Sequence, residues 1–194
     1  MDLDTIEALQ ALYISNPQYK DSTVESLCSL IETEPIALEI LELLGEESES
    51  KREEIMKFFV LNDSSYRSLI KLIIDNNSSS MVSGIKIINW ISNSKYIGKV
   101  GKKNLEEVLK GLVLALDIKG EREEEILVLA LQGLTAVLKW GSMNLLENGE
   151  NGLLIKLDEM EDSIRKIEEL QLHRSDKVYH LALEILENFA IDEE

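Results

Sequence analysis

The chain has 194 residues and a formal net charge of −17 at pH 7, with 44% hydrophobic and 29% charged residues. This composition is typical of a globular domain, and its acidity disfavours binding to nucleic-acid phosphates and to anionic membranes. Aromatic residues make up only 5% of the chain, so we expect no stacking surface for single-stranded nucleic acid.

Apolar residues recur with a helical period along nearly the whole chain, and only two prolines interrupt it. The first helix is expected over residues 3–14 and is predicted to cap the N-terminal end of the fold. A second helix is predicted from Val24 to about Ile31, where Glu25 is placed to complete a capping box with Ser22.

The next helix is predicted to start at Pro35, which suits a first turn, and to stop at Gly45. No segment has the pattern of a convincing strand. Further helices are predicted from Asn62 through Ile74, then to about Ser92 after a loop, from Leu105 to about Leu116, from Ile126 to Leu138, and from Val178 to Phe189.

The predicted helices group into four units of roughly 40 residues, a period near that of armadillo or HEAT repeats. The units are 21–45, 50–93, 103–140 and 151–190. Because one unit cannot bury its apolar face alone, the units are expected to stack. The predicted fold is therefore all-α, an armadillo/HEAT-type right-handed superhelical solenoid of about four repeats over residues 21–194, with residues 1–20 as an N-terminal cap. A compact helical bundle is the alternative.

The sequence offers no constellation for catalysis or for a cofactor. Its few candidate ligands are His173, His180 and the single Cys28, without the spacing of a zinc site. Cys28 lies among leucines and is expected to be buried. Phosphate-binding loops and nucleophile elbows are absent, and the many carboxylates are interpreted as solvated helix faces. We therefore expect neither an enzyme nor a bound metal or cofactor.

The single cysteine suits a reducing compartment. The acidic first residues lack the basic region of a signal peptide, and no uninterrupted apolar run approaches the roughly 20 residues of a membrane span. The expected location is the cytosol or the nucleus.

Charge is unevenly distributed along the chain. Residues 1–50 hold 12 acidic side chains and one basic side chain. Residues 51–110 hold 6 acidic and 11 basic side chains, and residues 111–194 hold 19 acidic and 8 basic side chains. The mildly basic middle contains one close cluster, formed by Lys95, Lys99, Lys102 and Lys103. It is interpreted as a solvated loop between helices, with a phosphate contact or a localisation signal as the alternative.

The C-terminal sequence resembles a known repeat. The stretch KIEELQLHRSDKVYHLALEILENFA, from Lys166 to Ala190, resembles the atypical last armadillo repeat of importin-α. The family pattern there is K-I-E-x-L-Q-x-H, a short polar turn, I-Y, A, I-I-E and an aromatic residue. This pattern is supplied by Lys166, Ile167, Glu168, Leu170, Gln171, His173, Val178, Tyr179, Ala182, Ile185, Leu186, Glu187 and Phe189.

Two upstream segments extend the resemblance. ALQGLTAVLKWG, residues 130–141, resembles the A-L-x-G-L-x-x-I-L helix of the preceding repeat. Residues 90–93, WISN, are similar to the family's W-A-I-S-N motif. The match is strongest over residues 130–194.

The resemblance implies an adaptor for nuclear protein import, present in the cytoplasm and the nucleus. In that family the concave face holds basic nuclear localisation signals through Trp and Asn side chains, and the last repeats dock an export receptor. The implied peptide-binding positions are Asn89, Trp90, Asn93 and Gln132. The implied positions for docking the export receptor are His173, Tyr179 and Glu187.

The sequence also departs from the family pattern. The first 50 residues are acidic where the family has a basic segment, and the chain is less than half the length of the usual array. The family's Asn position falls on Asn93, but its Trp position falls on Asn89, with Trp90 one residue later. Trp90 and Trp140 are therefore interpreted either as peptide anchors or as core residues, the latter favoured for Trp140. A generic armadillo/HEAT adaptor, such as a chaperone cofactor, is the alternative function, and a helical enzyme is a second one.

Overall fold

The computed structural model describes residues 11–19, 22–31, 33–74, 80–119 and 122–189. Within these ranges every regular element is a helix, in agreement with the predicted all-α class. Contacts divide the chain into two compact units, residues 1–91 and residues 92–194, each of which is described by itself. Most of the predicted capping helix, residues 3–14, lies outside the described residues. Its described part belongs to a helical segment, residues 11–15.

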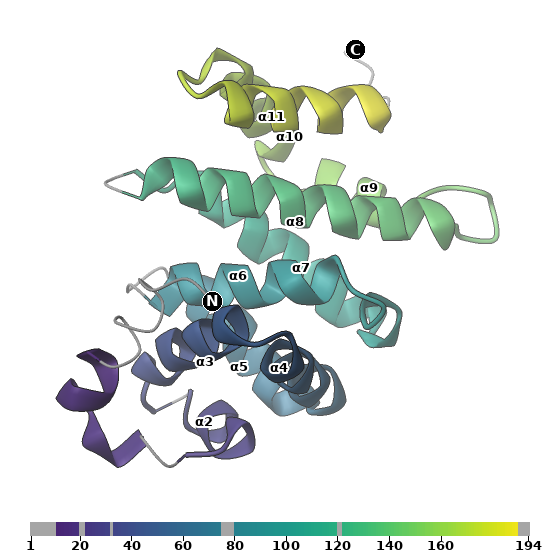
Figure 1. Cartoon of the computed structure of the whole chain (residues 1–194). Coiled ribbons are helices and arrows are strands. Elements are labelled where there is room, and N and C mark those ends of the chain that lie inside the picture. Colours follow the sequence, from purple (N-terminus) through teal and green to yellow (C-terminus); the bar gives the residue numbers. More distant parts are fainter. Residues whose placement is uncertain (1–10, 20–21, 32, 75–79, 120–121, 190–194) are drawn as a thin grey trace. The chain divides into compact units, whose positions relative to one another are not determined.

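The first unit is built from α-helices and one short 3-10 turn (Figure 1). Most of its largest buried side chains are aliphatic, and they fill the space between the helices. In chain order the described elements are η1 (Pro17–Tyr19), α2 (Val24–Leu30), α3 (Ile36–Glu47), α4 (Glu49–Leu61), α5 (Asp63–Ile74) and α6 (Ser80–Ser92).

Helix α2 begins at Val24, as predicted, but its N-cap lies one residue later than the capping box implies. Thr23 is the N-cap, and its hydroxyl oxygen accepts a hydrogen bond from the N–H of Ser26 at 3.2 Å. The predicted capping box between Ser22 and Glu25 is therefore wrong. Thr23 has the extended backbone of an N-cap, so its side chain meets the first unpaired N–H groups of the helix.

The end of α3 also differs from the prediction. The helix continues through Gly45 to Glu47 and stops at Ser48. Ser48 then serves as the N-cap of α4, since its hydroxyl oxygen accepts from the N–H of Lys51 at 3.5 Å. Gly45 is buried inside the helix, so its lack of a side chain serves packing rather than helix termination.

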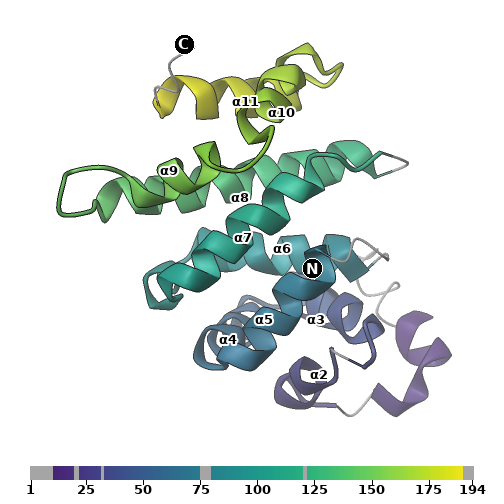
Figure 2. The same cartoon turned by 180° about the vertical axis from the view of Figure 1, so that it is seen from behind.

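The second unit contains the longest helix of the described chain, α8, which packs against α7, α9 and α11 (Figures 1 and 2). The hydroxyl of Ser175, the N-cap of α11, donates to the carboxylate of Glu124 in the first turn of α8 at 2.7 Å. This bond joins the N-terminal ends of α8 and α11, and Figure 1 shows the two helices running in the same direction from there. The described elements are η2 (Ile97–Lys99), α7 (Lys102–Ala115), α8 (Glu123–Met143), α9 (Gly152–Asp158), α10 (Ser163–Glu169), η3 (Leu170–Leu172) and α11 (Asp176–Asn188).

Helix α8 is long and apolar enough to cross a membrane by length and composition alone. Its most apolar 18-residue window has a mean hydropathy of 1.5. Polar residues interrupt this window, so it is not recognised as an uninterrupted apolar run. The same window is 56% buried inside the protein, against α7, α9 and α11. A core helix surrounded by neighbours has this composition too.

The predicted last helix is confirmed as α11. Val178, Ala182 and Ile185 form its buried stripe, at a spacing of four and then three residues. Helix α8 continues to Met143, and a loop then leads to α9. Asn151 ends this loop and caps α9, accepting hydrogen bonds from the N–H groups of Leu153 and Leu154.

Candidate functional site

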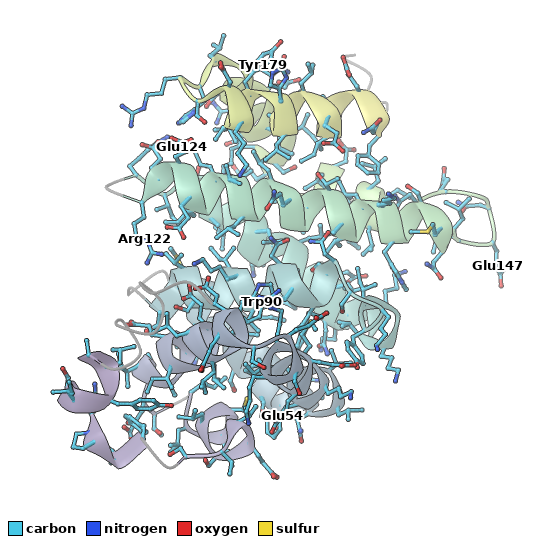
Figure 3. The ribbon with its side chains drawn as sticks, in the orientation of Figure 1. Glu54, Trp90, Arg122, Glu124, Glu147 and Tyr179 are labelled. Atoms are coloured by element: carbon cyan, nitrogen blue, oxygen red, sulfur yellow. The ribbon has the colours of Figure 1, made fainter. Side chains whose placement is uncertain are left out.

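Trp90, a predicted peptide-binding residue, is half-buried within the first unit (Figure 3). Its ring lies against Gly45 of α3, where an added Cβ would come within 2.6 Å of two ring carbons. The guanidinium carbon of Arg52 lies 5.0 Å from the centre of the ring. Arg52 Nε also donates to the carbonyl oxygen of Gly45 at 3.0 Å. The ring is thus held against the backbone of α3 on one side and the cation of Arg52 on another.

Polar side chains join α3 to α6 along their lengths. Ser80 donates to Glu39 at 3.2 Å, and further along both helices Lys86 donates to Glu46 at 3.1 Å. Since residue numbers rise together on the two helices, α3 and α6 run in the same direction. The same parallel arrangement relates α8 to α11 in the second unit (Figure 1). In both units, therefore, two longer helices from successive predicted repeats stack in parallel.

The centre of this contact is a buried carboxylate. Glu42 is only 7% exposed, and it accepts hydrogen bonds from Ser83 and Lys86. Burial by itself lowers the pKa of Lys86, but the hydrogen bonds and negative charges of Glu42 and Glu46 outweigh it and raise the pKa. Lys86 is thus held as a cation between two carboxylates, and these polar contacts are structural.

The three predicted peptide-binding amides occupy different settings. Asn89 is half-buried on α6, whereas Asn93 is exposed and lies one residue beyond the end of α6. Gln132 is half-buried near the middle of α8. Asn89 belongs to residues 1–91, and both Asn93 and Gln132 belong to residues 92–194. The peptide-binding role of these residues stays a prediction.

A hollow of about 310 Å³ opens in the second unit where α7 ends beside α10 and η3. Leu172, on η3, is 90% exposed at its edge, the highest exposure of any large apolar side chain in the described residues. Lys166 pairs with Asp117 at 2.6 Å, and this ion pair connects α10 to the second residue beyond the end of α7. The lining consists of Leu116, Asp117, Lys119, Lys166, Glu169, Leu170, Leu172 and His173.

Hydrogen bonds hold the polar edge of this hollow in place. His173 Nδ1 accepts from the backbone N–H of Ser175 at 3.1 Å, which leaves Nε2 to carry the proton of the neutral ring. Lys119 donates to Glu123 at 2.9 Å and lowers the pKa of that carboxyl, helped by the charge of Arg174. A preformed hollow with an exposed leucine beside charged groups suits a protein partner's apolar side chain.

The predicted docking residues lie at different distances from the hollow. His173 lines it. Tyr179 is half-buried on α11, with its ring 5.0 Å from that of His180 in an edge-to-face arrangement (Figure 3). Glu187 is exposed near the C-terminal end of α11. Neither Tyr179 nor Glu187 belongs to the lining of the hollow.

Leu172 was not among the site residues predicted from the sequence. Its position between Gln171 and His173 falls outside the helical period of α10, because the chain turns there as a 3-10 helix. An apolar residue out of phase with the buried stripe is the signal that could have found it. The neighbouring Leu170, in phase, is 6% exposed and belongs to the core.

Potential catalytic and metal-binding groups are dispersed. Among the described residues, no three His, Cys, Asp or Glu side chains lie close enough together to hold a metal ion. Cys28 is 1% exposed, and burial followed by the charge of Glu54 raises the pKa of its thiol. A thiol held in its neutral form is a poor nucleophile.

The second unit also carries the match to a known family. A family model described as an atypical Arm repeat matches residues 155–194. This region of the chain is similar to an armadillo-type repeat. It begins inside α9 and contains all of α10, η3 and α11. The prediction of an armadillo repeat here is therefore confirmed at the level of the repeat type. No curated protein matches the chain.

Proposed function

We propose that this protein is a protein-binding scaffold in which about four armadillo-type repeats form a right-handed solenoid. Two observations support the proposal: the atypical Arm repeat at residues 155–194, and the parallel stacking of longer helices within each unit. Repeats of this kind present ordered surfaces to other proteins rather than pockets for chemistry. The proposed role is binding, with no catalytic step and no cofactor.

The docking surface that we propose is the hollow beside Leu172. The observation that carries it is the 90% exposure of this leucine at the edge of a preformed hollow inside the matched repeat. Covering an exposed leucine with a partner's apolar surface removes it from water, which favours association. Charged groups of both signs at the rim, including Lys119 and Glu169, would set the orientation of the partner.

We further propose that the partner is the export receptor of importin-α, together with its GTPase. This finer proposal rests on the resemblance of Lys166 to Ala190 to the last repeat of importin-α, and it adds Tyr179 and Glu187 to the docking surface around His173. It places the protein in the cytoplasm and the nucleus. Basic localisation signals would bind weakly near Asn93 and Gln132, because the negative net charge speeds encounter with lysine-rich segments.

A pull-down with the export receptor and GTP-loaded GTPase tests this docking. Leu172→Asp should weaken binding by about tenfold or more, since it places a charge at an apolar contact. Leu61→Asp is the matched control, because Leu61 is 73% exposed in the first unit and should leave binding unchanged. Absence of wild-type binding at physiological salt contradicts the assignment to nuclear transport.

A generic armadillo/HEAT adaptor is the second candidate. It is favoured by the packing of Trp90 against Gly45 and Arg52, which engages the side chain that a signal-binding site would use. If the export receptor does not bind, the same Leu172→Asp and Leu61→Asp pair identifies the true partner. That partner should be captured by the wild-type protein and by Leu61→Asp, but lost with Leu172→Asp.

A further inference from the structure

A compact basic surface lies at the start of the second unit. Four lysines occur within nine residues, and all four side chains are exposed. The surrounding sequence is unusual for so acidic a chain, since no Asp or Glu occurs from residue 76 to residue 105. We call this surface the lysine patch; it consists of Lys95, Lys99, Lys102 and Lys103.

The patch is held on an ordered turn. Tyr96, Ile97 and Val100 are buried and fix the turn to the body of the unit. The ammonium nitrogens of Lys95 and Lys99 lie 5.3 Å and 5.7 Å from the centre of the Tyr96 ring. Both lysines are therefore gathered around one aromatic ring by cation–π attraction. Because the turn is already ordered, a ligand that binds the patch does not have to offset the conformational entropy lost when a flexible loop becomes fixed.

Lys102 and Lys103 add positive charge at the N-terminal end of α7, where the helix dipole is already positive. Lys102 and Lys103 occupy the first turn of α7, a helix of 14 residues with no acidic residue in that turn. The N-cap is Gly101, which has no side chain to accept from the first N–H groups. The positive end of the helix dipole repels these lysines, so an anionic ligand would relieve an unfavourable local arrangement.

We propose that the lysine patch binds an acidic, extended segment of a partner protein. The charges on the rest of the chain favour a narrow ligand over a broad anionic surface. Residues 111–194 hold 19 acidic and 8 basic side chains, and these would repel a nucleic-acid duplex or an anionic membrane. A peptide strand carrying several carboxylates can meet four lysines over a short span and avoid the acidic surroundings.

Trp140 provides an internal reporter next to this surface. Its indole nitrogen lies 3.6 Å from the position that a Cβ on Gly98 would occupy, in the middle of the turn that carries the patch. The other tryptophan, Trp90, lies in the first unit. Binding at the patch should therefore alter Trp140 fluorescence, and the change should persist in a Trp90→Phe variant.

The test is a titration of the full chain with a fluorescein-labelled oligoglutamate peptide, followed by anisotropy. Affinity should fall about tenfold or more between about 50 mM and about 200 mM salt, as expected for multiple ion contacts. The triple variant Lys99→Glu/Lys102→Glu/Lys103→Glu should lose binding at least tenfold. Two of these changes place acids at a helix N-terminus, where they stabilise the helix, so unfolding does not account for such a loss.

A control with the same change in net charge separates the patch from overall acidity. It carries Lys57→Glu, Lys71→Glu and Lys177→Glu, three exposed lysines outside residues 95–103, and should bind within about twofold of wild type. Equal losses in the two triple variants would overturn the proposal. So would tighter binding of single-stranded DNA or of phosphatidylserine vesicles than of the peptide. Neither result bears on Leu172, because docking at the hollow uses different residues.

Discussion

The Trp90 ring lies against the backbone of Gly45, 45 residues earlier in the chain, so closely that a Cβ at position 45 would come within 2.6 Å of two ring carbons. Gly45 is buried inside α3, and Ile55 lies 3.5 Å from the same point. An aromatic ring is rigid, so it cannot yield as the end of a flexible side chain would. The contact joins α3 to α6 and determines how closely these two helices approach.

Gly45→Ala should destabilise the protein by about 1–2 kcal/mol, even though alanine is the better helix former by up to about 1 kcal/mol. The reason is overlap of the new methyl group with the Trp90 ring. Guanidinium chloride unfolding followed by circular dichroism gives the free energy. In a Trp90→Leu background the cost of Gly45→Ala should largely disappear. An unchanged cost in that background would show that the ring is not the obstacle.

Arg52→Ala should cost about 1 kcal/mol, because it removes both the hydrogen bond to the Gly45 carbonyl and the cation beside Trp90. It should also uncover the ring, which acrylamide quenching measures in a Trp140→Phe background. Arg67→Ala is the control, since Arg67 forms an exposed pair with Asp63. The control should change stability by no more than about 0.5 kcal/mol and leave quenching unaltered.

Lys86→Met should destabilise the protein by about 3 kcal/mol, because it leaves the buried Glu42 carboxylate without its cation. The double variant Lys86→Met/Glu42→Gln should regain much of the loss, since no buried charge is then left unpaired. Denaturant unfolding of the four proteins in this cycle measures the coupling. If the second change adds to the damage instead, the buried charge is not the cause.

The ion pair between Lys86 and Glu42 should make the stability of the protein depend on pH. The folded-state pKa of Lys86 is raised above its ordinary value of 10.5, so its stabilising effect is complete below about pH 10.5. The effect is lost as the pH rises through the folded-state pKa. Wild-type stability should therefore fall more steeply above pH 10.5 than that of Lys86→Met/Glu42→Gln. The difference between the two proteins removes the contribution of tyrosines, which titrate in both.

Cys28 should resist thiol reagents in the folded protein. It is 1% exposed, and burial raises the pKa of the thiol, so almost no thiolate is present at neutral pH. A colorimetric disulfide reagent should react only as fast as the surrounding helices open. The same chain in concentrated guanidinium chloride should react fully and at once. Rapid reaction without denaturant would show that α2 opens readily on its own.

The helices could be predicted from sequence because their signals are local. The apolar period of α11 lies within 13 residues, and Asn62 to Ile74 agrees closely with the observed α5. The predicted end of α3 was wrong because glycine in a helical segment is compatible with two different structures. A glycine such as Gly45 can end a helix, but it can also allow the close approach of a distant side chain. The residues around position 45 do not indicate that Trp90 packs there.

The candidate site was predictable only in part, for a related reason. The matched repeat and His173 could be found from a contiguous pattern. For Leu172 the only sequence signal is its position out of phase with the buried stripe, which does not give its exposure, because that exposure depends on the 3-10 turn of η3 and on the packing of α10 beside the end of α7. Nor does the order of residues reveal that Arg52 covers the ring of Trp90, since this contact spans two helices.

The sequence by itself determined the all-helical class, the position of most helices and the armadillo-type repeat at the C-terminal end. These properties depend on residues that lie within a few turns of one another along the chain. Only the tertiary structure decided that Trp90 packs on Gly45 and that Leu172 faces solvent beside a hollow. Side-chain burial is set by whichever segments meet in space, and that meeting is determined by the fold as a whole.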